Sequence, residues 1–357
     1  AGLAVAMAAS GALLPAGSAP AAFAPAAASA QTGGPTRIMI VGDSASIGST
    51  NDYTWRYRLW KHLERTAPGT VDFVGERNDL YDFQGQQYGS QDYLDPAFDR
   101  DHHAHWGRAL REEKNTIDWA LGLNQADVLL LMMGAIDLAY FSTPQQVVDD
   151  VHALISRART VNPDIDVVVG HLVTVCDFWS ETVYLQAESA AYNQILDASV
   201  AGWSTPTSRV TTAAVDVGWN PRAMTWDCGH PNPDGEIHIA AAFADALASW
   251  GIGAPYGPRP TGVPWPVTGT TPTAVERPHG VELSWAPVPG AVAYYLQARV
   301  LSWGQQEFEQ LPWVVWENRW STDQLEPGWV IDWRVVPVKG SMIGQPGGHV
   351  RATALGP

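Results

Sequence analysis

The chain has 357 residues, which suits two domains, one of them large enough to bury a substantial core. Its formal net charge is -16, from 21 basic and 37 acidic residues, and it contains no basic tract. This balance argues against nucleic acid and against an anionic membrane surface as partners. After residue 33, no stretch approaches the run of about eighteen apolar residues that a membrane span needs, so we expect no transmembrane segment.

Residues 1–33 consist mainly of Ala, Gly, Ser, Pro and Leu. An apolar stretch at Ala1–Ala9 is followed by Pro15, and Ala28-Ser29-Ala30 is a small-x-small cleavage signal. The pattern predicts a signal peptide and therefore a secreted, extracellular protein. A disordered Ala/Pro leader is the alternative.

Between residues 34 and 256, apolar runs alternate with segments of helical spacing. The apolar runs predict strands at Arg37–Val41, Val71–Val74, Val128–Met133, Val167–Leu172 and Val210–Asp216. The other segments predict helices at Tyr53–Ala67, Leu110–Leu123, Pro144–Val161, Glu181–Ala201 and Pro233–Trp250. This alternation predicts an α/β domain, a three-layer parallel sheet covered by helices on both faces. The long polar connection at residues 75–106 is expected to shape the entrance to a site at the strand ends.

Residues 257–357 have a different sequence pattern, a proline-rich segment followed by short strands. The segment Pro255–Pro272 contains six prolines, both ends included, so residues 257–272 are expected to form a stiff linker. Residues 273–357 contain short strands separated by Pro/Gly turns, which predicts a small all-β sandwich. The expected strands are Val281–Trp285, Ala293–Val300, Trp313–Trp316, Val330–Val336 and a tail near Val350.

Tryptophans and a strand pattern characterise this second domain. Segments His279–Tyr295 and Trp333–Val338 resemble strands B, C and F of fibronectin type III domains. Trp285 and Trp333 alternate with apolar neighbours and are expected in the core, while some of Trp313, Trp316 and Trp320 should be exposed.

Two short motifs carry the chemistry. Gly42-Asp43-Ser44 closes the first apolar strand, which puts a serine hydroxyl at the carboxyl edge of the sheet. Far downstream, Asp227-Cys228-Gly229-His230 supplies an imidazole and a carboxylate three residues apart. Together these groups provide the nucleophile, base and orienting acid that acyl transfer by serine requires. Each motif taken alone also fits an ordinary structural turn.

Over most of residues 34–256 the chain resembles the SGNH (GDSL-type) hydrolases, whose sheet is flavodoxin-like. The resemblance rests on Gly42-Asp43-Ser44 and on Asp227-x-x-His230, which is followed by Pro231-Asn232. It implies Ser44 as nucleophile, His230 as base and Asp227 as acid. It also implies an oxyanion hole formed by the backbone amides of Ser44 and Gly107.

One position departs from that family's pattern. The third block, normally Gly-x-Asn-Asp, reads Gly134-Ala135-Ile136-Asp137 here. Ile136 cannot donate the hydrogen bond that the family's Asn gives to the oxyanion. The absence of one such donor typically lowers the rate by about 10²–10³-fold. Asp137 is expected to cap or brace the site, and Asn193 to make a structural hydrogen bond.

The substrate is implied by a narrower resemblance. Segments Gly42–Gly48, Tyr53–Trp60 and Val71–Gly75 look most like carbohydrate esterase family three, whose members remove acetyl groups from polysaccharides such as xylan. We therefore predict a secreted serine esterase that acts on an ester, most simply a short acyl group on a polysaccharide. The alternative is a catalytically weakened scaffold that acts as a glycan- or cell-surface-binding protein, which Ile136 and the Trp-rich domain motivate.

The sequence also contains two cysteines and a group of possible metal ligands. Cys176 and Cys228 are expected to form a disulfide, although two free thiols remain an alternative. A group of potential metal ligands matches no closed structural zinc pattern, and no phosphate or nicotinamide fingerprint occurs. We therefore predict neither a metal nor a cofactor. The group consists of Asp99, Asp101, His102, His103 and His105.

Overall fold

The apolar runs of the N-terminal domain form one parallel sheet in the computed structural model, which describes residues 34–180 and 182–357. The leader expected at residues 1–33 lies outside the described residues. The sheet has the strand order β10-β7-β6-β1-β2, and β5 pairs with the end of β1. Its strands are β1 (Thr36–Gly42), β2 (Val71–Val74), β5 (His103–Ala104), β6 (Val128–Met132), β7 (Asp166–Gly170) and β10 (Val210–Ala213).

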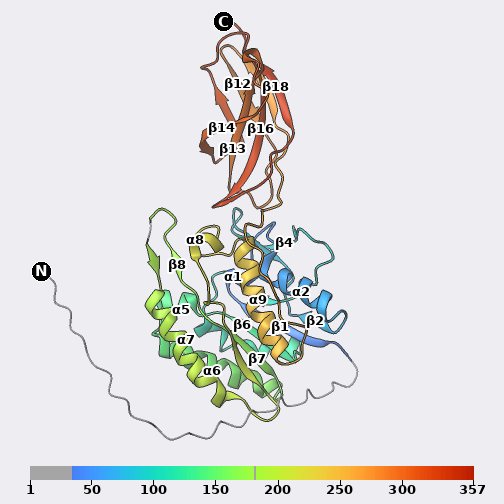
Figure 1. Ribbon diagram of the computed structural model, residues 1–357, viewed down its shortest axis with the longest axis vertical. Coiled ribbons are helices and arrows are strands. Elements are labelled where there is room, and N and C mark those ends of the chain that lie inside the picture. Colours follow the sequence, from blue (N-terminus) through green and yellow to red (C-terminus); the bar gives the residue numbers. More distant parts are fainter. Residues whose placement is uncertain (1–33, 181) are drawn as a thin grey trace, which may run out of the picture. The chain divides into compact units, whose positions relative to one another are not determined.

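Helices cover both faces of this sheet (Figure 1). Ile38 and Ile40 of β1 pack with helices α2 and α9, whereas Met39 and Val41 pack with α4, α6 and α7. The three-layer α/β fold is confirmed, and its strand order is the flavodoxin-like one. The helices are α1 (Ser44–Ile47), α2 (Thr54–Thr66), α3 (Leu110–Glu113), α4 (Ile117–Leu123), α5 (Ala135–Tyr140), α6 (Pro144–Val161), α7 (Gln186–Val200), α8 (Pro221–Met224) and α9 (Pro233–Ser249).

Two predicted helices differ from the structure. The helix expected over Leu110–Leu123 is divided into α3 and α4. At the break, the Thr116 hydroxyl donates a hydrogen bond to the Glu113 carbonyl (3.2 Å), so a side chain competes with the helical backbone ladder. The helix expected to begin at residue 181 begins at Gln186, because residues 182–184 take part in the short hairpin of β8 (Val175–Cys176) and β9 (Val183–Tyr184).

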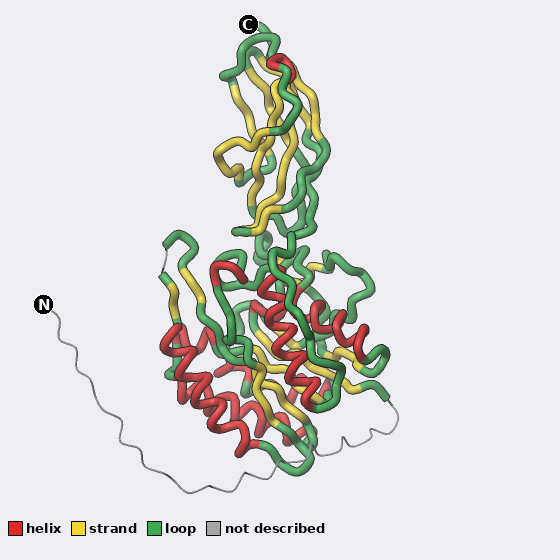
Figure 2. Tube along the Cα trace, viewed as in Figure 1, coloured by secondary structure: helices red, strands yellow, loops and turns green. Residues whose placement is uncertain are grey.

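The C-terminal domain consists almost entirely of strands and loops (Figure 2). A three-stranded antiparallel sheet, β11-β12-β15, faces a five-stranded one. The second sheet has the strand order β14-β13-β16-β17, and its fifth strand, β18, pairs with β16. This confirms the expected sandwich. The strands are β11 (Thr273–Arg277), β12 (Gly280–Ser284), β13 (Ala293–Val300), β14 (Glu309–Val315), β15 (Arg319–Thr322), β16 (Val330–Lys339), β17 (Met342–Ile343) and β18 (His349–Thr353).

The tryptophans of the sandwich divide as expected. Trp285 and Trp333 are buried in its core, while Trp313 and Trp316 are 48% and 66% exposed. Strands β11 and β15 were not predicted, because their side chains are mostly exposed and polar and so produce no apolar run.

The proline-rich segment 257–272 is more than a spacer. Trp265 and Val267 are buried in the same hydrophobic cluster as the sandwich core. The Trp265 indole donates a hydrogen bond to the Asn51 carbonyl (3.1 Å), and the Gly269 amide donates one to the Gln345 carbonyl (2.8 Å). The segment is therefore fixed by contacts with the residues on both sides of it.

Among the helices of the described residues, none is both long and apolar enough to cross a membrane.

Candidate active site

Ser44 lies where β1 meets α1, at the carboxyl edge of the sheet. Asp43 caps α1, and its Oδ1 accepts a hydrogen bond from the Ala45 amide (3.0 Å). Burial raises the pKa of Asp43 to about 6. The preceding Gly42 is required by packing, because a Cβ there would lie 2.1 Å from the Ser46 hydroxyl. This tight turn leaves Ser44 half-buried, two residues after the end of β1.

Asp227 and His230 lie on the loop between α8 and α9. His230 Nδ1 is 2.7 Å from Asp227 Oδ2, and the other carboxylate oxygen accepts hydrogen bonds from the amides of His230 (2.7 Å) and Gly229 (3.0 Å). Although burial raises the pKa of Asp227, these hydrogen bonds and the charge of His230 outweigh burial and lower it. An ionised Asp227 assigns the Nδ1 proton to this contact and leaves Nε2 available as a base.

One small pocket brings the motifs together. Ser44 and His230 both line it, together with Trp106 and Trp226. No hydrogen bond joins the Ser44 hydroxyl to His230 within residues 34–180 and 182–357. Such contacts are often long in enzymes without substrate and shorten in the reacting complex, so this geometry is compatible with a serine–histidine pair.

A column of stacked rings surrounds the imidazole. Trp106 stacks on His230, with ring centroids 4.5 Å apart, and its other face stacks on Tyr81 at 4.4 Å. Trp226 also stacks on His230, with centroids 5.4 Å apart, so the imidazole contacts two indoles. Tyr81 and Trp106 belong to the connection at residues 75–106, which therefore lines the site. The sequence reading did not identify this arrangement, although Trp106 precedes Gly107 and Trp226 precedes Asp227.

Gly107, the predicted oxyanion donor, lies next to a pocket residue, and the family's asparagine is replaced by Ile136. Gly107 is exposed, adopts a φ of 74°, and follows the pocket residue Trp106. Its amide and that of Ser44 donate no hydrogen bond within the described part of the chain, so both are free to bind an oxyanion. Ile136, in the first turn of α5, has an apolar side chain that cannot donate a hydrogen bond.

Asp137 and Asn193 have the bracing roles expected of them. The carboxylate of Asp137 is buried and accepts hydrogen bonds from the amides of Leu110 (2.7 Å) and Arg111 (3.0 Å), at the start of α3. Asn193 binds both the amide and the carbonyl of Leu172 (2.9 and 3.0 Å). Asp137 thus ties the first turn of α5 to the segment that follows Gly107.

A buried arginine that the sequence reading missed holds the nucleophile helix. Arg56 of α2 donates hydrogen bonds to the carbonyls of Ser46 (2.8 Å) and Ile47 (3.0 Å) at the end of α1. A cation at a helix C-terminus is electrostatically favourable. Nothing in the local pattern distinguishes this arginine from a surface one.

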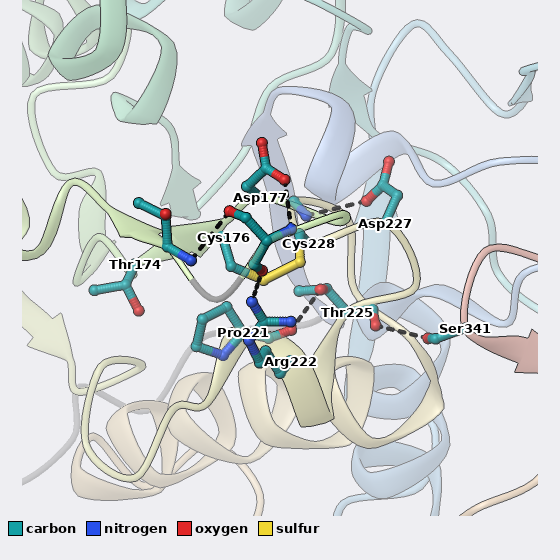
Figure 3. Close-up of a disulfide and its surroundings, with 12 residues drawn as sticks. Thr174, Cys176, Asp177, Pro221, Arg222, Thr225, Asp227, Cys228 and Ser341 are labelled. Atoms are coloured by element: carbon teal, nitrogen blue, oxygen red, sulfur yellow. Dashed lines mark hydrogen bonds between the residues drawn. A yellow bond between two sulfur atoms is a disulfide. The ribbon is translucent and has the colours of Figure 1, made fainter.

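Cys176 and Cys228 form a disulfide, drawn in Figure 3. The Cys176 amide also donates a hydrogen bond to the Cys228 carbonyl (3.0 Å). Cys228 directly follows Asp227, so the bridge fixes the loop that carries Asp227 and His230 to β8.

The histidine-rich segment is mainly an ionic network. His103 is buried between two carboxylates, with Nδ1 2.7 Å from Glu76 and Nε2 2.8 Å from Glu113. Although burial lowers the pKa of His103, the two carboxylates outweigh it and raise the pKa to about 9. Ligand atoms of Glu76, His103 and His105 lie within 4.8 Å of one another, the spacing of a possible metal site. Both ring nitrogens of His103 are already bonded to carboxylates, however, which fits an imidazolium better than a metal ligand.

The other proposed ligands have separate structural roles. His102 contacts the Asp79 carbonyl through Nε2 (2.9 Å) and accepts a hydrogen bond from the Ala104 amide at Nδ1 (3.0 Å). Asp99 accepts a hydrogen bond from the Phe73 amide (2.7 Å). Sequence reasoning missed Glu76 and Glu113 because they lie outside the histidine-rich run.

Solved structures of similar chains fall into two groups. A carbohydrate esterase family 3 from Talaromyces cellulolyticus is 25% identical and has a TM-score of 0.49, over 60% of this chain and 96% of that one. A family 3 carbohydrate esterase of Clostridium thermocellum is 20% identical, with a TM-score of 0.47, over 61% and 99% of the two chains. A human fibronectin type III domain is 19% identical, with a TM-score of 0.22, over 25% and 73%.

Comparison with curated proteins found no match. The model of the GDSL-like lipase/acylhydrolase family matches residues 40–236, which is more than half of the chain. The matched region begins within β1 and ends in the first turn of α9, so it includes Ser44, Asp227 and His230. The chain therefore belongs to the GDSL-like lipase/acylhydrolase family.

Proposed function

We propose that this acylhydrolase is a serine esterase with Ser44 as nucleophile, His230 as base and Asp227 as acid. The observation that carries the proposal is the single pocket lined by Ser44 and by the imidazole that Asp227 orients. Ser44 Oγ attacks the ester carbonyl while His230 Nε2 takes its proton. The amides of Ser44 and Gly107 bind the oxyanion. His230 then protonates the leaving alkoxide, and a water activated by the same imidazole hydrolyses the acyl-enzyme.

We further propose a hydroxyl-rich substrate, a polysaccharide that carries short acyl groups. A polar groove adjoins the catalytic pocket, since Thr50 lines the groove while its neighbour Ser49 lines the pocket. The Tyr88 hydroxyl donates a hydrogen bond to the Trp106 carbonyl (3.0 Å) and so links the groove to the stacked rings. Amide and carboxylate side chains beside an aromatic ring suit sugar hydroxyls and ring faces. The groove is lined by Asp82, Gln84, Gln87, Tyr88, Asp92 and Pro287–Gly290, among others.

We also propose that the enzyme works outside the cytoplasm. The disulfide between Cys176 and Cys228 supports this location, because such bridges persist mainly in oxidising compartments. The Ala-rich sequence of residues 1–33 is the expected export signal. Expression of the chain with residues 1–33 in a bacterial host, followed by N-terminal sequencing of exported protein, tests it. Retention of uncleaved protein in the cytoplasm would contradict it.

The direct test of the chemistry is hydrolysis of p-nitrophenyl acetate by the wild type and by Ser44→Ala. We expect the variant to lose at least about 10³-fold in kcat and to lose labelling by a fluorophosphonate. Equal rates for the two proteins would defeat the proposal, and a wild type that binds insoluble polysaccharide without turnover would favour a binding protein.

The substrate class needs a separate measurement. We expect Tyr88→Ala to raise KM for an acetylated xylo-oligosaccharide severalfold, and to raise KM for p-nitrophenyl acetate much less. Tyr140→Ala is the matched control, because Tyr140 is exposed on α5 and does not line the groove. Equal effects of Tyr88→Ala on both substrates would contradict the assignment of the groove.

A further inference from the structure

The turn between β16 and β17 of the sandwich contacts two segments that lie next to the proposed catalytic groups in the chain, one after α1 and one directly before Asp227. The contacts are made by the last residue of β16, Lys339, and by the two residues that follow it, Gly340 and Ser341, and these three residues are counted together as the turn. We propose that this turn, named here the bracing turn, positions the catalytic site, so that the C-terminal domain is part of the working enzyme. The inference rests on the proposed function.

The first contact is a buried ion pair. Lys339 Nζ lies 2.6 Å from Asp52 Oδ1, and the two side chains are only 1% and 7% exposed. The other oxygen of Asp52 accepts hydrogen bonds from the amide (2.8 Å) and hydroxyl (3.0 Å) of Ser49. Asp52 and Ser49 both line the catalytic pocket, directly after the helix that begins with Ser44. Lys339 thus fixes the wall of the pocket on the nucleophile side.

The second contact holds the histidine side of the pocket. The Ser341 amide donates a hydrogen bond to the Trp226 carbonyl (2.7 Å), and its hydroxyl donates one to the Thr225 carbonyl (3.0 Å), the bond drawn in Figure 3. Lys339 Nζ also lies 5.1 Å from the centroid of the Trp226 ring. That ring stacks on His230, so the bracing turn reaches the imidazole through one intervening side chain.

Gly340 shows how closely the two domains approach. Its φ is 57°, and an added Cβ would lie 1.9 Å from the Trp226 carbonyl oxygen. No side chain fits there without moving the turn away from Trp226. Misplacing catalytic groups by about 1 Å can cost 10²-fold in rate. Lys339 and the rest of the bracing turn are therefore positioning residues that touch no substrate.

The experiment measures kcat and KM for p-nitrophenyl acetate in the full chain, with active sites counted by endpoint fluorophosphonate labelling. Lys339→Met removes the cation and keeps most of the side-chain length. Gly340→Ala pushes the turn off Trp226 and removes no charge. We expect each variant to lose at least fivefold in kcat per labelled serine, with KM within twofold of the wild type.

Matched controls lie at the other end of β16. Gly328 has a φ of 85°, yet an added Cβ there meets no atom within 4 Å, so Gly328→Ala imposes similar backbone strain without contacting the catalytic loop. Arg299 pairs with the buried Asp332 (2.9 Å), so Arg299→Met breaks an ion pair within the sandwich alone. Both controls should keep kcat per labelled serine within twofold of the wild type, whatever they do to the melting temperature.

The outcomes separate the two proposals. A fall in melting temperature or labelled fraction without a fall in kcat per labelled serine would reduce the bracing turn to a structural contact and overturn the inference. Where Lys339→Met does not fold, because Asp52 is left buried without its partner, Gly340→Ala and the double variant Asp52→Asn/Lys339→Met decide the question. A wild type that neither turns over nor labels would instead refute the proposed function, and the inference with it.

Discussion

The imidazole of His230 stacks on the indole of Trp106, with ring planes 19° apart and centroids at 4.5 Å. In the proposed reaction this imidazole is neutral before attack and becomes an imidazolium in the transition state. An indole face attracts a cation more strongly than a neutral ring. The stack therefore stabilises the transition state more than the ground state, which is the condition for accelerating the chemical step.

Trp106→Leu should lower kcat for p-nitrophenyl acetate by about 3- to 30-fold. The estimate is a cation–π contribution of about 0.7–2 kcal/mol converted to a rate. Leucine keeps apolar cover over His230 but has no π-face. Tyr81→Leu is the control, because Tyr81 contacts the far face of Trp106, and it should cost less. An unchanged kcat in Trp106→Leu would argue against electrostatic stabilisation by the ring.

The sequence predicted those features that depend on residues close together in the chain. The apolar runs identified the strands of the parallel sheet, and two short motifs predicted Ser44 and His230 as partners, which the structure brings to one pocket. Contacts between distant residues produce no such pattern: Lys339 pairs with Asp52 across 287 positions. Polar strands such as β15 were missed for a related reason, since their alternation does not separate apolar from polar residues clearly. Burial of Arg56 likewise depends on the assembled tertiary structure.

Ile136→Asn should raise kcat by about tenfold or more. An amide at this position supplies the hydrogen-bond donor that the family pattern has and this chain lacks, and one such donor is worth about 10²–10³ in fully aligned sites. Ile136→Ala removes the apolar side chain beyond Cβ without adding a donor and should give no gain. If the two variants behave alike in the p-nitrophenyl acetate assay, the oxyanion is already fully bound by backbone amides or lies elsewhere.

The disulfide should stabilise both the fold and the catalytic loop. Cys176 and Cys228 are 52 residues apart, a loop for which unfolded-state entropy alone gives about 4 kcal/mol. Replacing both cysteines by alanine should therefore lower the free energy of unfolding by about 2–4 kcal/mol in urea titrations. It should also lower kcat, because Cys228 adjoins Asp227. Wild type treated with a reductant should behave in the same way, and equal urea midpoints would contradict the prediction.

His103→Gln should destabilise the protein by about 3 kcal/mol near pH 6, because it leaves the buried carboxylate of Glu113 and the half-buried one of Glu76 without the cation between them. The pKa of His103 is raised from 6.5 to about 9 in the folded protein. Its charge therefore contributes fully below pH 6.5, and the contribution is lost as the pH rises through about 9. Urea titrations between pH 6 and 10 should show the gap between wild type and variant becoming smaller.

The neighbouring His102 provides a control with the opposite sign. Burial and the nearby charge of Arg56 lower the pKa of His102 well below 6.5, so it stays neutral in the folded protein. Its contribution is present above pH 6.5 and is lost as the pH falls, because the unfolded chain then binds the extra proton. His102→Gln should therefore show a gap that becomes smaller toward acid, whereas the gap of His103→Gln becomes smaller toward alkali. Parallel pH trends for the two variants would contradict an imidazolium at His103 and favour a neutral ring there.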